Sequence, residues 1–279
     1  MLVWGNAGLF PRAFERLAAL TARRRPPVAV WHSEVLPFPR ASGVPRPRLS
    51  ARELAKAVLG HPRAIDPYTN ARRLVRLVRR RLVDLVVVIS EDRREFLAER
   101  GVEAEVVPRG YHLSFGSDLG GERDVDVLFL GALDVPRRRR LLRGLERAGI
   151  DVLARGDWRD PRYWGAPRAA LLNRAKISLN LSRHAGQFSG DRFTLSMGNG
   201  ALVVSEPAHR PAPFRPGEHY VEAPASELAA TISGLLADDE ERQRIGAAGR
   251  DFVTRELTMT RAAARVLALM DERSRHRLT

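Results

Sequence analysis

The stretch DRFTLSMGNGALVVSE, residues 191–206, contains the pattern from which we predict the fold. A short helical segment runs into Asn199-Gly200, a typical helix stop because asparagine and glycine tolerate the left-handed conformation. A short apolar strand follows and ends at Ser205-Glu206. The same order of strand, polar loop and helix recurs along the chain, and it predicts repeated βαβ units with parallel sheets.

Two blocks of this pattern are separated by a segment rich in glycine and polar residues, 109–124, which we expect to be an interdomain linker. The expected strands before it are 2–4, 27–31, 84–90 and 104–108, and those after it are 125–131, 150–156, 177–182, the strand of the quoted stretch and 219–223. The chain is therefore predicted to be an α/β protein with two Rossmann-like domains. The N-terminal domain comprises residues 1–118, linker included, and the C-terminal domain comprises residues 119–258. A C-terminal helix over 259–279 could pack back on the N-terminal domain.

Composition narrows the class of protein. The 279 residues are 44% hydrophobic and 29% charged, as in soluble globular proteins, and the chain has no cysteine for disulfides or thiol nucleophiles. No apolar run is long enough to span a membrane and the N-terminus lacks a secretory pattern, so we expect a cytoplasmic protein. The net charge of +14 comes almost entirely from arginine and would attract nucleotides, nucleic acid or acidic lipids alike.

Ligands of open α/β sheets bind beyond the carboxyl ends of the strands. In the second domain one of these ends is followed by a helix whose expected cap is Ser189 or Asp191, and a helix N-terminus suits a phosphate. Arg192 lies in the first turn, where the helix dipole disfavours a cation, which favours a compensating anion; the alternative is a solvated arginine. His184, in the loop before this helix, is either a ligand contact or a surface histidine.

Other polar residues at this edge have two interpretations each. Glu206 could accept a hydrogen bond from a ribose hydroxyl or be an ordinary loop acid. One or two arginines of the run 137–140 could face a diphosphate, although such runs are usually solvated. In the first domain His32 ends a strand, where either a substrate-facing base or a buried structural histidine is expected. Residues 5–8 lie between a strand and a helix but lack the spacing of a phosphate-binding fingerprint.

Helix 70–82 places leucine and valine on one face with arginines around it. This pattern predicts either a basic surface helix that packs on the sheet or a patch that lies on a membrane surface.

Three segments together resemble a known family. They are LNLSRHAGQFSGDRFTLSMGNGALVVSEP (179–207), FRPGEHYVEAPASELAATISGLLADDEERQRIGAAGRDFV (214–253) and DLVVVISEDRREFLAERGVEAEVVPRGYH (84–112). They are similar to GT-B glycosyltransferases of the group-1 type, specifically the spore-maturation-protein-like family. The resemblance covers residues 84–258 well and 1–83 loosely.

The resemblance implies a transferase, of hexosyltransferase type, that binds a nucleoside-diphosphate-sugar in the C-terminal domain and an unidentified acceptor in the N-terminal domain, with chemistry in the cleft. It implies no bound metal, no cofactor beyond the donor co-substrate, and retention of anomeric configuration. Carried over by position, the catalytic candidates are His32, His184 and Arg192; the donor-binding candidates are Gly131, Arg137, Arg138, Arg139, Gln187, Phe188, Ser189, Ser205 and Glu206; the acceptor-binding candidates are Asn6, Ser33 and Glu34.

The sequence departs from the family in two ways. Many members carry two glutamates eight residues apart at this helix, and the matching positions hold Gln187 and Leu195. The N-terminal domain also begins at a strand that resembles an internal one, which predicts a shortened domain. These departures favour an alternative, a non-catalytic GT-B-like protein that binds nucleic acid or an anionic membrane through its basic surface. Nucleic acid is the less expected partner, since aromatic residues make up only 6% of the chain and no recognition-helix motif is evident.

Overall fold

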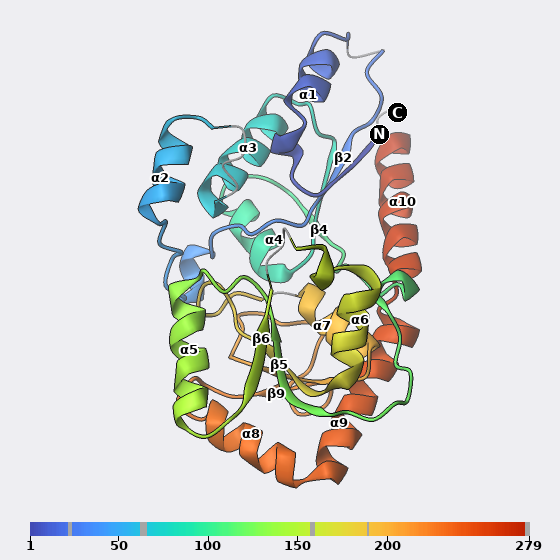
Figure 1. Ribbon diagram of the computed structural model, residues 1–279. Helices are drawn as coiled ribbons and strands as arrows, with labels where there is room; N and C mark the ends of the chain where they lie inside the picture. The colour runs from blue at the N-terminus through green and yellow to red at the C-terminus, as the bar shows by residue number, and fades with distance from the viewer. Residues whose placement is uncertain (22–23, 62–65, 157–159, 189, 277–279) are drawn as a thin grey trace. The chain divides into compact units, whose positions relative to one another are not determined.

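The chain forms two compact units, one made of Met1–Pro108 with Ala263–Thr279 and the other of Arg109–Ala262 (Figure 1). The computed structural model describes residues 1–21, 24–61, 66–156, 160–188 and 190–276. The sequence placed 109–118 with the N-terminal domain, whereas in the structure this segment clusters with the C-terminal unit.

The N-terminal unit is built on a four-stranded parallel sheet in the order β1-β2-β3-β4. Its strands are β1 (Leu2–Trp4), β2 (Ala29–His32), β3 (Leu85–Val88) and β4 (Glu105–Val106), and its helices are α1 (Pro11–Ala18), α2 (Ala51–Val58), α3 (Pro67–Arg79), α4 (Glu91–Ala98) and most of α10 (Met259–His276). Every residue of the central strands β2 and β3 is buried, as expected for a parallel sheet covered on both faces. The helix expected at 70–82 begins earlier, because the Asp66 side chain caps it and Pro67 suits its first turn.

The C-terminal unit has a five-stranded parallel sheet in the order β6-β5-β7-β8-β9. The strands are β5 (Val125–Leu130), β6 (Val152–Arg155), β7 (Ala175–Asn180), β8 (Leu202–Ser205) and β9 (Val221–Glu222). The helices are α5 (Pro136–Arg147), α6 (Gly165–Arg174), α7 (Gly190–Gly198), α8 (Leu228–Ala237) and α9 (Asp239–Asp251), the last followed by a π-helical turn over Phe252–Glu256. Both sheets confirm the predicted parallel α/β architecture.

Alternation along the strands sorts the side chains of the C-terminal unit into two core layers. Val127 and Phe129 of β5 pack in a cluster with residues of α5 and α8, whereas Leu128 packs with α6. On the side of α6 and α7, the rings of Phe193 and Tyr220 lie in an aromatic cluster, with centroids 4.7 Å apart. The quoted stretch therefore supplies the helix α7 to one layer and the internal strand β8 to both layers.

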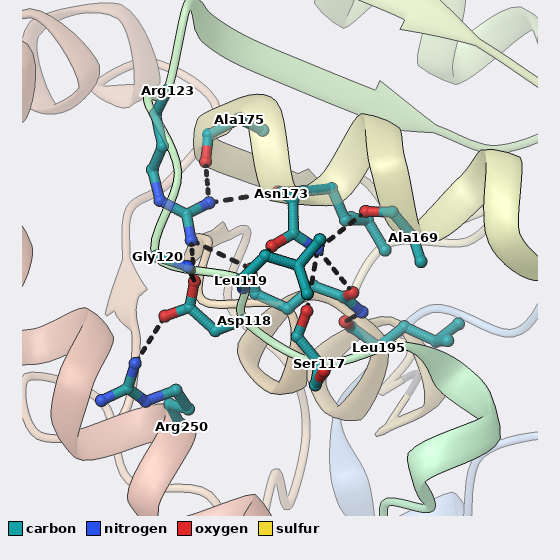
Figure 2. A network of polar contacts seen from close by, with 12 residues as sticks. Ser117, Asp118, Leu119, Gly120, Arg123, Ala169, Asn173, Ala175, Leu195 and Arg250 are labelled. Atoms are coloured by element: carbon teal, nitrogen blue, oxygen red, sulfur yellow. Dashed lines mark hydrogen bonds and ion pairs between the residues drawn. The ribbon is translucent and has the colours of Figure 1, made fainter.

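The turn after α7 has the predicted geometry and an additional role. Gly200 has φ +79°, the left-handed conformation expected at a helix stop. Asn199 is fully buried, and its side-chain amide donates to the carbonyls of Phe115 (3.0 Å) and Leu195 (2.8 Å). Its Oδ1 accepts from the side-chain amide of Asn173 (3.0 Å), so this turn is the centre of a hydrogen-bond network. Figure 2 shows the part of the network around Asn173.

The network attaches the segment 109–124 to the C-terminal unit, where the sequence suggested a loose linker. The amide of Asn173 also donates to the Ser117 carbonyl (2.9 Å), and Arg123 donates to the Asn199 carbonyl (3.0 Å). Asp118 forms ion pairs with both Arg123 (2.9 Å) and Arg250 (Figure 2). Apart from the Asp118–Arg123 pair, these contacts join residues at least 56 positions apart in sequence, so no local periodicity predicts them.

We predict that Asn199→Ala lowers the free energy of unfolding of the C-terminal unit by about 2–4 kcal/mol, because it leaves buried carbonyl and amide groups without partners. Thermal and urea denaturation measure the change. Gly121→Ala is the matched control in the same region, since a Cβ there would meet no atom within 4 Å. A loss for Asn199→Ala no larger than that of the control would contradict the structural role of the network.

Candidate functional site

Two arginines meet at the carboxyl edge of the sheet in the C-terminal unit. Arg138, in the first turn of α5, donates from Nε to the Leu181 carbonyl (2.9 Å). Arg192, in the first turn of α7, donates from Nη1 to the same carbonyl (3.2 Å) and to Asn180 Oδ1 (3.1 Å), and from Nε to the Leu130 carbonyl (3.2 Å). The ends of β5 and β7 therefore hold both side chains through backbone carbonyls and an amide oxygen.

The charge of this pair is not balanced by a nearby ion pair. Among the described residues, neither Arg138 nor Arg192 forms a salt bridge to a carboxylate. Burial, then the charges of Arg192 and Arg183, lowers the pKa of Arg138 to about 9. Burial and the charge of Arg183 lower the pKa of Arg192 to about 10. Both groups stay protonated at neutral pH, so this edge carries concentrated positive charge that favours an anion.

Glycine at position 131 lets the chain pass close to both guanidinium groups. A Cβ at Gly131 would lie 3.1 Å from Arg192 Nη2, 3.5 Å from Arg138 Nη1 and 3.0 Å from the Phe129 ring. The ring of Phe129 also lies below the cations, with its centroid 5.6 Å from the Arg138 guanidinium carbon and 5.7 Å from that of Arg192. The structure thus brings together three of the predicted site residues, Gly131, Arg138 and Arg192.

A cavity of about 180 Å³ opens beside Arg192. Its walls are mostly apolar and include Leu195 and Leu172, with Trp164 and Arg168 from the start of α6. The Arg168 guanidinium lies 5.4 Å from the Trp164 ring, and its buried Nε has no hydrogen-bond partner. Trp164 and Arg168 were not among the site residues predicted from the sequence; an exposed tryptophan in a loop that follows a strand is the signal that could have found them.

Two predicted donor-binding residues pair with each other. Arg137 donates from Nη1 to Glu206 Oε2 (2.8 Å), from Nη2 to the second carboxylate oxygen, and to the Ser182 carbonyl (3.1 Å). Each thereby neutralises the charge of the other, and a role of either in donor binding stays a prediction. Arg139 is exposed on α5, and of the predicted arginine run it is Arg138 that is buried at the sheet edge.

The loop before α7 is folded on itself. Ser182 Oγ donates to the backbone carbonyl of Gln187 (2.6 Å), and the backbone N–H of Gln187 donates to the backbone carbonyl of the half-buried His184 (3.1 Å). The buried Gln187 Oε1 has no hydrogen-bond partner. Phe188 is buried in the aromatic cluster, and Ser205 is fully buried beside Asn180.

The expected helix cap is only partly described. Ser189 lies outside the described residues. Asp191 is not the cap, because α7 begins at Gly190; instead it lies in the first turn and forms an ion pair with Arg109. Its carboxylate is stabilised there by the free N–H groups of the helix start as well.

The three acceptor candidates and His32 lie at the carboxyl ends of β1 and β2 in the N-terminal unit. Asn6 is buried, accepts from the Gly8 amide (2.9 Å) and donates to Asn70 (2.8 Å), so it organises the turn after β1. Ser33 and Glu34 are half-buried after β2. Their roles in acceptor binding stay predictions.

His32 is 1% exposed, and neither ring nitrogen has a hydrogen-bond partner of good geometry. Burial and the charge of Arg93, partly offset by the Gly5 backbone, lower the pKa of His32 to about 3. Arg93 is itself buried, and its Nη1 has no hydrogen-bond partner. The imidazole is therefore neutral at physiological pH and sits beside a buried cation.

Comparison with known proteins shows which fold this chain shares and which family its C-terminal part is similar to. Residues 137–268 match the family model described as glycosyl transferase-like. Comparison with curated protein sequences gave no match. The GT-B fold and the resemblance to glycosyltransferase enzymes are confirmed, whereas the spore-maturation-like group stays a prediction.

Three solved structures illustrate the similarity. TarM of S. aureus is 12% identical, with a TM-score of 0.66 over 96% of this chain and 54% of TarM, so the chain spans about half the length of that protein. HepE of Anabaena, in complex with UDP and glucose, is 15% identical, with a TM-score of 0.66 over 97% of this chain and 78% of HepE. Sucrose-phosphate synthase of Thermosynechococcus elongatus is 17% identical, with a TM-score of 0.59 over 97% of this chain and 73% of its own.

The pKa of His32 predicts an acid-sensitive N-terminal unit. Since the folded pKa of about 3 lies below the ordinary 6.5, the unfolded chain binds the proton first, and stability is lost as the pH falls from 6.5 toward 3. By pH 4.5 the loss from this group is about 2–3 kcal/mol. We expect urea denaturation at pH 7 and pH 4.5 to show a smaller loss for His32→Asn than for the wild type. His112→Asn, at an exposed histidine, is the control; equal losses for all three proteins would contradict the assignment.

Proposed function

We propose that the protein is a glycosyltransferase that moves a sugar from a nucleoside-diphosphate-sugar to a hydroxyl of its acceptor. The observation that carries the proposal is the pair Arg138 and Arg192, two cations held at the carboxyl edge of a parallel sheet with no carboxylate between them. A diphosphate bound at this edge would accept hydrogen bonds from both guanidinium groups and balance their charge. The UDP and glucose bound to HepE support a nucleotide-sugar as the donor.

The reaction places its charge where these cations lie. The acceptor oxygen forms a bond to the anomeric carbon, the bond from that carbon to the diphosphate oxygen breaks, and the acceptor hydroxyl gives its proton to the departing diphosphate oxygen. Negative charge grows on the leaving diphosphate, and Arg138, Arg192 and the first turn of α7 would stabilise it. Electrostatic stabilisation of this kind needs no further group on the protein. Metal independence and retention of configuration, which the resemblance implies, are part of the proposal.

His32 would position the acceptor rather than remove its proton. A general base works best with a pKa near the operating pH, and a pKa of about 3 makes His32 a weak base. A neutral imidazole can still accept a hydrogen bond from a hydroxyl. We assign His184 to a hydrogen bond with a hydroxyl of the donor sugar, because an imidazole can form such a bond and the loop before α7 follows the carboxyl end of β7.

The two departures from the family change how the donor would be held. Leu195 lines the apolar cavity, so this position offers a nonpolar surface where many relatives have a carboxylate. The cavity with Trp164 beside it suits a flat ring, and we infer that it takes the base of the nucleotide. The unpartnered Oε1 of Gln187 is available to accept from a hydroxyl.

A second proposal concerns where the protein acts, and it rests on α2 and the neighbouring α3. None of the described residues of α2 is buried, and the exposed fractions of Leu54, Val58 and Leu59 are 53%, 77% and 81%. The segment after α2 contacts α3, since Arg73 donates to the His61 carbonyl (3.1 Å), and the exposed residues of α3 include Arg72, Arg76 and Arg79. We infer peripheral binding to an anionic membrane, with apolar side chains of α2 entering the interface and arginines of α3 facing lipid phosphates.

No helix in the described part of the chain has the length and apolar character to cross a bilayer. Cytoplasmic location stays a prediction. The non-catalytic alternative would be favoured over the enzyme by steep salt-dependent binding to duplex DNA together with no binding of any nucleotide-sugar.

The donor site is tested by calorimetric titration with UDP-, GDP- and dTDP-sugars. We predict that Arg138→Gln and Arg192→Gln each weaken binding of the preferred donor about 10- to 100-fold, because each removes charge-assisted hydrogen bonds to the diphosphate. Arg139→Gln removes the same charge from the exposed side of α5 and should bind like the wild type. A folded wild-type protein that binds none of the panel, or equal affinities for all three variants, would refute the donor site.

Membrane binding is tested by co-sedimentation with vesicles that contain phosphatidylglycerol. Replacing Val58 and Leu59 with glutamine should reduce the bound fraction at least tenfold, since each buried apolar side chain contributes about 1.5–3 kcal/mol. The same change at Leu113 and Leu119, which are 75% and 77% exposed in the C-terminal unit, is the control. Equal binding by the two double variants, or binding to neutral vesicles alone, would contradict the assignment of α2.

A further inference from the structure

A second hollow in the C-terminal unit lies at the opposite edge of its sheet from the arginine pair. It is a groove of about 550 Å³, bounded by the first residues of β7 and β8, by residues 118–123 and by one face of α9. A volume of this size is typical of a small-molecule site. The proposed donor site does not use it, because that site lies at the carboxyl ends of the same strands.

The walls of the groove carry more positive than negative charge. Four cations line it, Arg123, Lys176, Arg242 and Arg250, together with a single acidic side chain, that of Asp118. Asp118 is shared by two of the arginines, Arg123 and Arg250, so one carboxylate faces two guanidinium groups (Figure 2).

The other two cations have weak partners. Lys176 pairs with Asp126 (2.6 Å), and Arg242 pairs with Asp239 at the start of α9. The side chains of Lys176 and Asp126 are 33% and 52% exposed, and an exposed pair of this kind contributes little to stability. Arg242 is buried and is also held by the Leu235 carbonyl (2.8 Å), so it is less free to turn toward a ligand. An anion in the groove could therefore pair with Lys176, because breaking the Lys176–Asp126 pair loses little free energy. It could also pair with Arg250, which shares the Asp118 carboxylate with Arg123.

Glycines form much of the remaining surface. Gly120 and Gly121 lie on one wall, and Gly246 lies on α9 between Arg242 and Arg250. A Cβ at Gly121 would meet nothing within 4 Å, so the backbone there is open to a ligand. The helical rise places Arg242 and Arg250 about 12 Å apart along the groove, on either side of this small residue. Close access to backbone, flanked by cations, is the usual environment of a bound phosphate.

We propose that this groove binds a small phosphate-bearing anion of the size of a diphosphate or a sugar phosphate, with Lys176 and Arg250 as the groups that pair with it. The site is separate from the proposed donor site and does not depend on it.

Lysine side-chain NMR tests the proposal directly, because Lys56 and Lys176 are the only lysines in the chain. The full-length protein is labelled with [13C,15N]lysine and titrated with inorganic pyrophosphate, and Lys56→Arg assigns the two sets of signals. We expect the Lys176 signals to shift and saturate at millimolar pyrophosphate while those of Lys56 stay in place. Unshifted Lys176 signals at that concentration would overturn the proposal.

Two further variants separate specific binding from a general charge effect. Gln243 is exposed on the groove-facing side of α9, and Gln243→Glu adds a negative charge there without removing a native ion pair. It should weaken the Lys176 response about tenfold, a loss of about 1.4 kcal/mol. Arg244→Gln changes the net charge equally on the same helix, outside the groove, and should leave the response unchanged. Equal weakening by both variants would show attraction by net charge alone and would overturn the site.

Pyrophosphate could also enter the donor site, so the response is measured in Arg192→Gln as well. The groove predicts that Lys176 shifts in this variant as in the wild type. Loss of the shift in Arg192→Gln would mean that the signal reports the donor site, which would overturn the groove and leave the donor proposal standing.

Discussion

Two guanidinium groups held together without a carboxylate between them are the constraint around which the C-terminal unit is organised. Arg138 comes from α5 and Arg192 from α7, and both donate to the carbonyl of Leu181. Like charges repel strongly where water is excluded, so this arrangement costs free energy until an anion arrives. The carbonyls at the strand ends offset part of that cost, which explains why the pair lies at this edge of the sheet.

At the opposite edge of the same sheet a carboxylate pairs with the arginines, and α7 runs between the two edges. Arg192 lies in the first turn of α7, and Asn199 follows its last residue. At that far end the buried Asn199 ties the segment 109–124 to the unit, and Asp118 joins two arginines. Rigid attachment of α7 at one end supports a fixed position of Arg192 at the other, and electrostatic stabilisation of a leaving group depends on such a fixed position.

The sequence predicted those features that depend on the residues of one short segment, such as strands, helices and the position of strand ends. Alternating strands and helices predicted both parallel sheets, and the rule that ligands bind beyond strand ends directed attention to the edge at which Gly131, Arg138 and Arg192 lie close together. Contacts between distant segments were not predictable in this way. Arg137 and Glu206 are 69 residues apart, and Asn199 is 84 residues from the Phe115 carbonyl, one of the two carbonyls to which its side chain donates. Phe188 lies in a polar loop, yet its ring belongs to an aromatic core that only the folded chain assembles.

The most direct test of the central claim is a crystal structure of the protein with the nucleoside diphosphate that binds it. We expect diphosphate oxygens within hydrogen-bond distance of Arg138 and Arg192, with the base in the cavity beside Leu195. An ordered nucleotide bound elsewhere, with both guanidinium groups still bonded only to backbone carbonyls and Asn180 of the protein, would contradict this role of the arginine pair.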